Sequence, residues 1–147
     1  MTIATTAQIG IVIVAHGGLA VEYRAAMEHV VGPQNGVATV AIGPHDARAD
    51  KQDEICAAIA TVDAGVGVVI VTDMFGGTPS NLALAACESD ARRVIYGANL
   101  PLLVKLAKAR RKSLAVAVDF ALTAGRKYID CCTPATNAPA LKAVAGK

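Results

Sequence analysis

The stretch I-G-I-V-I-V-A-H-G-G, from Ile9 to Gly18, decides the fold of this chain. Six of its first seven residues are apolar, which is typical of a strand buried on both faces of a parallel sheet. His16 follows this run, and Gly17 and Gly18 then allow a tight turn. Functional groups collect at the carboxyl ends of strands in an open α/β sheet. His16 is therefore a candidate functional residue.

The composition indicates one folded domain. The chain has 147 residues, of which 54% are hydrophobic and 18% charged, enough to bury a core without disulfides or a structural metal. We expect a single domain over residues 1–133 and a loosely ordered tail over residues 134–147. The formal charge of +2 is too balanced to indicate binding of nucleic acid or of an anionic membrane.

The sequence also predicts a location. No run approaches the roughly 18 consecutive apolar residues of a membrane helix, and the N-terminus lacks the pattern of a secretory signal. We therefore expect a cytoplasmic protein without membrane insertion. The four cysteines show no C-x-x-C spacing, so buried or half-buried thiols in a reducing compartment are expected. They are Cys56, Cys87, Cys131 and Cys132.

One local cluster of cations runs from Lys105 to Lys112 and contains five basic residues. Cations near the end of a helix complement the helix dipole. We interpret the cluster as a solvated helix end, with a dedicated docking patch as the alternative.

Strands and helices alternate along the chain. Apolar runs predict strands after the first one at Gly36–Ile42, Val66–Thr72 and Arg92–Tyr96. Periodicity, caps and breakers predict helices at Leu19–Val31, from Asp46 or Asp50 to about Val62, from Thr78 to about Cys87, from Pro101 to about Arg111, and at Leu114–Thr123, the last stopping near Gly125. This order predicts a doubly wound α/β fold with a mainly parallel four-stranded sheet and helices on both faces. A further strand in Lys127–Thr133 is expected at an edge, antiparallel to the others.

Three predicted strands end in polar groups, namely His16, Asp73 and Asn99. A carboxylate beside an imidazole keeps one ring nitrogen protonated and leaves the other as a nucleophile or proton acceptor. Backbone N–H groups at helix starts suit a phosphoryl dianion. We expect those groups from the glycine pairs and from Thr78, which we interpret as a helix cap; the glycines are Gly17, Gly18, Gly76 and Gly77.

Together these residues predict a phosphohistidine site. Taken alone, a histidine after a strand is more often a loop or partly buried residue than a catalyst, and Asp73 and the G-G-T-P motif could be a strand-end cap and turn chemistry. One histidine and one aspartate are too few ligands for a catalytic metal, so no metal and no other cofactor is expected.

Three motifs carry a resemblance to a known family. They are V-A-H-G-G at Val14–Gly18, T-D-M-F-G-G-T-P-S-N at Thr72–Asn81 and G-A-N-L-P at Gly97–Pro101. In these motifs the chain resembles the mannose-type enzyme IIA of the bacterial phosphoenolpyruvate-dependent phosphotransferase system (PTS), over about Ile9 to Tyr128. One departure is that the family's usual G-G-S-P-F-N has Thr78 and Ser80 here, so a large apolar side chain is missing.

The resemblance implies a phosphotransferase function. His16 would accept a phosphoryl group from the phosphocarrier protein HPr and pass it to an enzyme IIB partner during sugar uptake. Asp73 would bind Nδ1–H, so that Nε2 attacks phosphorus. The family also implies a homodimer that swaps the C-terminal strand. The alternatives are a stand-alone regulatory phosphocarrier and a non-catalytic binding module that senses the state of a phosphorelay.

Overall fold

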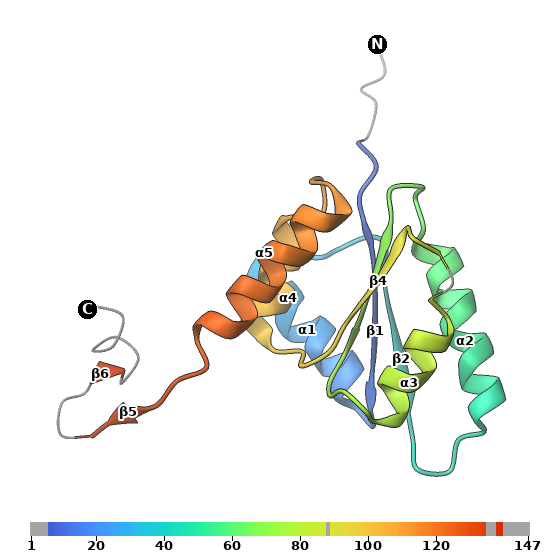
Figure 1. Ribbon diagram of the computed structural model, residues 1–147, viewed down its shortest axis with the longest axis horizontal. Coiled ribbons are helices and arrows are strands. Elements are labelled where there is room, and N and C mark those ends of the chain that lie inside the picture. The colour runs from blue at the N-terminus through green and yellow to red at the C-terminus, as the bar shows by residue number, and fades with distance from the viewer. Residues whose placement is uncertain (1–5, 88, 135–137, 140–147) are drawn as a thin grey trace.

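The computed structural model describes residues 6–87, 89–134 and 138–139 (Figure 1). Its main sheet has four parallel strands in the order β2-β1-β3-β4. The strands are β1 (Gly10–His16), β2 (Val37–Ile42), β3 (Val68–Thr72) and β4 (Arg92–Ile95). The predicted four-stranded parallel sheet is confirmed.

Five helices pack on the two faces of this sheet in the described part of the chain. They are α1 (Leu19–Val31), α2 (Arg48–Val62), α3 (Thr78–Ala85), α4 (Leu100–Lys108) and α5 (Leu114–Lys127). Figure 1 shows α1, α4 and α5 on one side of the strands and α2 and α3 on the other. This confirms the predicted helices on both faces. None of these described helices is both long and apolar enough to span a membrane.

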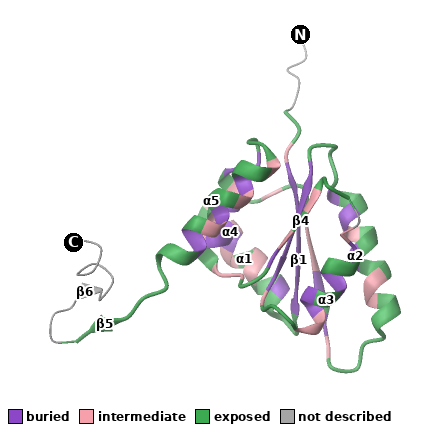
Figure 2. Cartoon of the chain, viewed as in Figure 1, coloured by how far each residue is buried: buried purple, intermediate pink, exposed green. Residues whose placement is uncertain are grey.

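The central strand β1 supplies both cores by simple alternation. Ile11 and Ile13 face the core under α1, α4 and α5, whereas Val12 and Val14 face the core under α2 and α3. Every residue of β1 is buried until the chain reaches His16 (Figure 2). Full burial of one such aliphatic side chain contributes about 1.5–3 kcal/mol, which explains the unbroken apolar run.

The strand order places β1 at the point where the connections change direction. From β1 the chain passes through α1 to β2 on one side, and it then returns through α2 to β3 on the other side of β1. The carboxyl ends of β1 and β3 therefore adjoin at the topological switch point, where doubly wound proteins bind their ligands. His16 closes β1, and Asp73 follows the last residue of β3.

The interpretation of the cationic cluster as a solvated helix end is wrong for Arg110, whereas the other four cations of the cluster are exposed. The helix α4 ends at Lys108, and the side chain of Arg110 turns inward, where the residue is only 3% exposed. Its Nε donates to the carbonyl of Ile9 (2.7 Å), and its Nη1 and Nη2 donate to Gln34 Oε1 and the carbonyl of Gly36 (both 3.1 Å). Arg110 thus joins the start of β1 to the loop before β2.

We expect Arg110→Ala to lower the free energy of unfolding by about 3 kcal/mol, because one buried and two part-buried acceptors lose a charged donor. Urea denaturation measures the change. The neighbouring Arg111 is exposed, so Arg111→Ala is a matched control that should stay within about 0.5 kcal/mol of wild type. Equal midpoints for the two variants would show that the Arg110 contacts contribute little.

The helix α5 continues through Gly125, where we had expected it to stop. A Cβ on Gly125 would lie 3.0 Å from side-chain atoms of Leu102 on α4. The glycine therefore allows α4 and α5 to pack closely, a need that is not visible in a local sequence pattern.

The C-terminal segment differs from the prediction in its position. The strand β5 (Cys132–Thr133) pairs antiparallel with β6 (Ala138–Pro139), and this ribbon is separate from the four-stranded sheet. The antiparallel strand thus forms, but not at an edge of the main sheet of its own chain, and the swap between subunits stays a prediction. The pairing also crosses the expected domain boundary after residue 133. The remaining tail residues, 135–137 and 140–147, lie outside the described residues.

The cysteines are more exposed than we expected. Cys87 is half-buried, but Cys56, Cys131 and Cys132 are exposed, and all four are free thiols. The prediction of buried or half-buried thiols is therefore wrong for three of the four.

Candidate phosphoryl-transfer site

The structure brings His16 and Asp73 together across the switch point. The backbone N–H of His16 donates to Asp73 Oδ2 (2.9 Å), and His16 Nδ1 lies 2.7 Å from the same oxygen. The other carboxylate oxygen, Oδ1, accepts the backbone N–H of Met74 (2.9 Å). Asp73 therefore fixes both the backbone and the ring of the histidine, as the sequence suggested.

The electrostatics of the pair favour one histidine tautomer. Burial raises the pKa of the Asp73 carboxyl, but the hydrogen bonds from His16 and Met74 outweigh burial, and the net pKa is lowered. Asp73 is therefore an ionised acceptor at neutral pH, and the nitrogen facing it must carry a proton. In the neutral form of the ring, Nε2 is then the nitrogen without a proton; the His16 side chain is 47% exposed and that of Asp73 only 9%.

The backbone N–H groups of the four glycines next to His16 and Asp73 are not equally available to a ligand. Gly17 donates its N–H to the carbonyl of Ile42 (2.9 Å), and Gly76 donates to Ser80 Oγ (3.0 Å). Among the described residues, the N–H groups of Gly18 and Gly77 have no hydrogen-bond partner. These two glycines immediately precede the first residues of α1 and α3, where the helix dipole favours an anion. Only half of the predicted cradle is thus available to a phosphoryl group.

Ser80, not Thr78, secures the loop before α3. Gly77 occupies the cap position, Thr78 is the first residue of the helix, and the expected side-chain cap from Thr78 does not form. The fully buried Ser80 accepts from Gly76 N–H and donates to the Gly77 carbonyl, both at 3.0 Å. Ser80 therefore makes two hydrogen bonds that shape the glycine loop.

Asn99 lies at the expected edge of the sheet, but its side chain is committed elsewhere. Its Oδ1 accepts the backbone N–H of Leu102 (3.0 Å) and caps α4, while Nδ2 donates to the carbonyl of Gly125 (2.8 Å). Asn99 therefore joins α4 to α5 and positions the loop after β4. Both polar atoms of the Asn99 side chain thus have partners within the fold, and a role of Asn99 in lining the phosphoryl site stays a prediction.

Tyr23 is a neighbour of the site that sequence reasoning missed. Its hydroxyl donates to the carbonyl of Ala98 (3.3 Å). Burial raises the pKa of the Tyr23 phenol, and the charge of Asp73 raises it further. No local sequence signal distinguishes Tyr23 from a core tyrosine.

Exposed apolar side chains lie in the loops that follow Asp73 and β4. Met74 and Phe75, in the loop after Asp73, are 56% and 64% exposed. The ring of Phe75 packs against Tyr96 with 4.7 Å between the centroids, and Tyr96 follows β4. Exposed apolar groups beside a reactive side chain are typical of a surface that contacts another protein.

Gly77 also leaves room for the imidazole. A Cβ at this position would lie 3.1 Å from His16 Cε1 and 3.6 Å from Nε2, although the backbone φ of −80° suits any residue. We expect Gly77→Ala to fold normally and to react at His16 about tenfold more slowly, because the methyl group crowds the ring. Thermal unfolding and a time course of phosphorylation measure the two effects. Wild-type kinetics would mean that the ring tolerates the methyl group.

The fold and this pair define a doubly wound α/β protein with a histidine–aspartate pair at the switch point of its sheet. Residues 10–122 match the family described as "PTS system fructose IIA component", also called EIIA-man. This match covers most of the chain, so the protein belongs to the EIIA-man family of PTS components.

A curated relative agrees with this assignment. The mannose-specific PTS EIIAB component of Escherichia coli K12 is 30% identical over 146 residues, which cover 92% of this chain and 45% of that protein. The chain thus spans less than half the length of this relative.

Solved structures share the fold. The PTS component EIIA from Streptococcus agalactiae has a TM-score of 0.74 at 23% identity, over 87% of this chain and 98% of that one. The mannose/sorbose-specific IIA subunit from Enterococcus faecalis has a TM-score of 0.77 at 22% identity, over 86% of this chain and 96% of that one.

Proposed function

We propose that this protein carries phosphoryl groups on His16 within a sugar phosphotransferase system. In the proposed reaction, Nε2 of His16 attacks the phosphorus of phospho-HPr in line. The bond from phosphorus to the donor nitrogen breaks as the bond to Nε2 forms, and the Nδ1 proton stays in its hydrogen bond with Asp73. An enzyme IIB partner then removes the phosphoryl group by the same chemistry in the reverse sense. The observation that carries this proposal is the 2.7 Å contact between His16 Nδ1 and Asp73.

The chemistry requires little more than positioning and charge stabilisation. Phosphorylation attaches a group with negatively charged oxygens to Nε2, and we propose that these oxygens accept the N–H groups of Gly18 and Gly77, which have no partner among the described residues. The carboxylate of Asp73 stabilises the positive charge that develops on the ring during attack. No metal ion enters this scheme, and in the described part of the chain no three His, Cys, Asp or Glu side chains are grouped to hold one.

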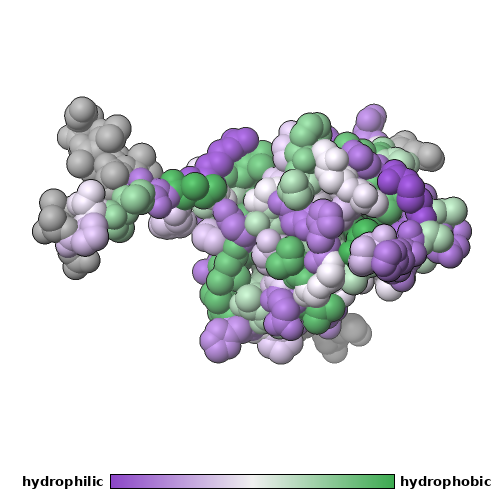
Figure 3. Space-filling model, turned by 90° about the horizontal axis from the view of Figure 1, so that it is seen from below, coloured by the Kyte–Doolittle hydropathy of each residue, from purple (hydrophilic) through white to green (hydrophobic). Residues whose placement is uncertain are grey.

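The surface around His16 fits a protein donor and a protein acceptor. Figure 3 views the molecule from the end at which the strands finish, and apolar surface lies there among polar groups. The exposed Met74, Phe75 and Tyr96 supply apolar contacts beside the ring. We propose that HPr and enzyme IIB use this same surface in turn, in the cytoplasm, because each must bring its reactive group to Nε2.

We also propose the homodimer that the resemblance implies. The strand β4 is an outer strand of the sheet, and an apolar groove of about 380 Å³ runs along it between Ile95, Val118 and Leu122. An unpaired sheet edge readily accepts an added strand. The segment around Cys132–Thr133 of a second copy is the proposed occupant.

Incubation with phosphoenolpyruvate, enzyme I and HPr tests the proposed reaction. The expected product carries an acid-labile, base-stable phosphate, and a IIB partner added afterwards removes it. A label that forms but is never passed to a IIB protein would instead favour the regulatory phosphocarrier. Absence of any label on wild-type protein would contradict both and leave the non-catalytic binding module.

A further inference from the structure

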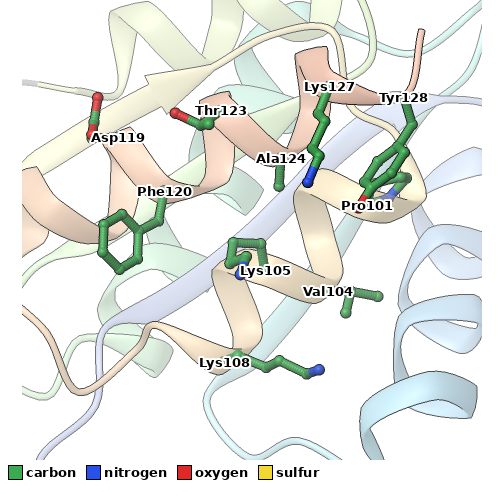
Figure 4. A pocket seen from close by; sticks show the side chains of 10 residues that line it. All are labelled: Pro101, Val104, Lys105, Lys108, Asp119, Phe120, Thr123, Ala124, Lys127 and Tyr128. Atoms are coloured by element: carbon green, nitrogen blue, oxygen red, sulfur yellow. The ribbon is translucent and has the colours of Figure 1, made fainter. Parts of the chain in front are cut away.

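A second candidate site lies between α4 and α5, on the outer side of these helices (Figure 4). The groove has a volume of about 580 Å³, and its floor is formed by Pro101, Val104 and the buried Ala124. Its rim carries cationic and aromatic side chains, namely Lys105, Lys108, Lys127, Phe120 and Tyr128. None of these residues takes part in the proposed phosphoryl transfer.

Two exposed aromatic side chains lie on the outer side of α5 and at its end. Phe120 and Tyr128, which just follows the helix, are 40% and 65% exposed. In Figure 4 their rings lie at opposite ends of the groove. Phe120 and Tyr128 are eight positions apart in the sequence, which corresponds to about 12 Å at the normal helical rise. Apolar groups on the outer face of a helix indicate that another surface covers them.

The charges around the groove are mostly of one sign. Lys105 and Lys108 come from α4, and Figure 4 shows Lys127 reaching from α5 toward α4. Among the described residues, the ion pairs of basic side chains involve only His16, Arg24 and Lys51, so these three ammonium groups have no carboxylate partner. Asp119 is the single acidic residue of the lining. The groove is therefore complementary to an acidic occupant.

The exposure of the lining decides the class of that occupant. Sites for small molecules bury about 70–90% of the ligand surface. Here seven of the ten lining residues are themselves exposed, so the groove can cover a ligand on one side only. An amphipathic helix suits such a site, because its apolar face fills the groove while its polar face stays in water.

We propose that the α4–α5 groove binds an acidic amphipathic helix of a partner protein. The apolar stripe of that helix packs on Val104, Ala124 and the rings of Phe120 and Tyr128. Its carboxylates pair with Lys105, Lys108 and Lys127. This proposal does not depend on phosphorylation of His16, because the two surfaces share no residue.

A synthetic peptide of roughly 14 residues tests the proposal, since shorter isolated helices are marginal in water. It carries leucines at i, i+3, i+4 and i+7 and glutamates elsewhere; a second peptide carries lysines in place of the glutamates. Titration calorimetry should give a Kd of about 100 µM or tighter for the acidic peptide and no measurable binding of the basic one. NMR shift changes on addition of the acidic peptide should map to α4 and α5.

Substitutions at exposed positions locate the site without disturbing the fold. We expect the triple variant Lys105→Gln, Lys108→Gln and Lys127→Gln to bind the acidic peptide about tenfold more weakly, and Phe120→Ala to weaken binding similarly. The exposed Arg111 lies outside the groove, so Arg111→Gln is the matched control and should bind like wild type. All of these variants should keep the wild-type rate of phosphorylation at His16.

Four outcomes would overturn the proposal. One is the absence of binding of the acidic peptide below about 1 mM. Another is equal affinity of the triple lysine variant and the Arg111 control. The third is a lower molecular mass of the lysine or Phe120 variants in sedimentation experiments, which would assign the groove to contacts between copies of this chain. Binding of anilinonaphthalene sulfonate in place of either peptide would likewise assign it to a small organic anion.

Discussion

Replacing His16 by alanine is expected to abolish phosphorylation of this protein by phospho-HPr. The chain has three histidines, and His16 is the one held by a carboxylate at the switch point of the sheet. The expected loss is complete within detection, because no other group in the site offers an unprotonated nitrogen to phosphorus. The incorporation of phosphate from phosphoenolpyruvate, in the presence of enzyme I and HPr, measures the effect.

The fold should survive this change. The His16 ring is 47% exposed, and without it Asp73 still accepts the backbone N–H groups of His16 and Met74. Circular dichroism and thermal unfolding should therefore match wild type. His29 and His45 are both exposed and serve as matched controls; His29→Ala and His45→Ala should keep full labelling. Undiminished labelling of the His16 variant would contradict the proposed acceptor.

Replacing Asp73 by asparagine should slow phosphoryl transfer by about a hundredfold, within the range that positioned acid–base groups contribute. Three N–H donors meet the two carboxylate oxygens of Asp73. An asparagine has only one oxygen, so in either orientation its NH₂ group faces at least one donor. The imidazole then loses its fixed tautomer and orientation. Single-turnover kinetics with phospho-HPr measure the rate.

The control for this variant is Asp53→Asn, because Asp53 is exposed on α2 and outside the site. It should transfer at the wild-type rate. If Asp73→Asn transferred equally fast, the orienting role of Asp73 would be wrong even though His16 remained the acceptor.

Loss of this carboxylate should make the stability difference between Asp73→Asn and wild type depend on pH. Hydrogen bonds lower the pKa of Asp73 in the folded state, so its ionised form stabilises the native protein above the unfolded pKa of about 3.9. This stabilisation disappears as pH falls through the lower folded pKa. Asp73→Asn should therefore lose stability relative to wild type at neutral pH and approach wild type in strong acid.

The main sheet could be predicted because its signals are local. The run Ile9–Ala15 is buried on both faces, and the helix Leu19–Val31 begins and ends in the structure where its glycines and periodicity placed it. The pairing of His16 with Asp73 also followed from the sequence, since parallel strands bring their carboxyl ends to one edge.

The details of the site depend on contacts that a linear pattern does not encode. Thr78 has the right chemistry for a cap, but the buried Ser80 two residues later makes the bonds that hold the loop. Asn99 lies where a ligand was expected, but its side-chain NH₂ group donates to the carbonyl of Gly125, far along the chain. In both cases a long-range or loop contact decided which polar group was free.

The burial of Arg110 could not be predicted from the sequence either. Within the run of cations from Lys105 to Lys112 it has no distinguishing sequence signal. It is buried because the carbonyls of Ile9 and Gly36 and the amide of Gln34 happen to converge at the end of the sheet. The position of the C-terminal strand could not be predicted from its sequence either. In the structure β5 pairs with β6 and not with the main sheet.

The central claim is that Asp73 holds His16 so that Nε2 carries the phosphoryl group. Heteronuclear NMR of the phosphorylated protein, with ¹⁵N-labelled histidine, identifies the modified nitrogen directly. The account predicts one phosphohistidine, at residue 16, with phosphorus bonded to Nε2 and a proton retained on Nδ1. A phosphoryl group on Nδ1, or on His29 or His45, would contradict it.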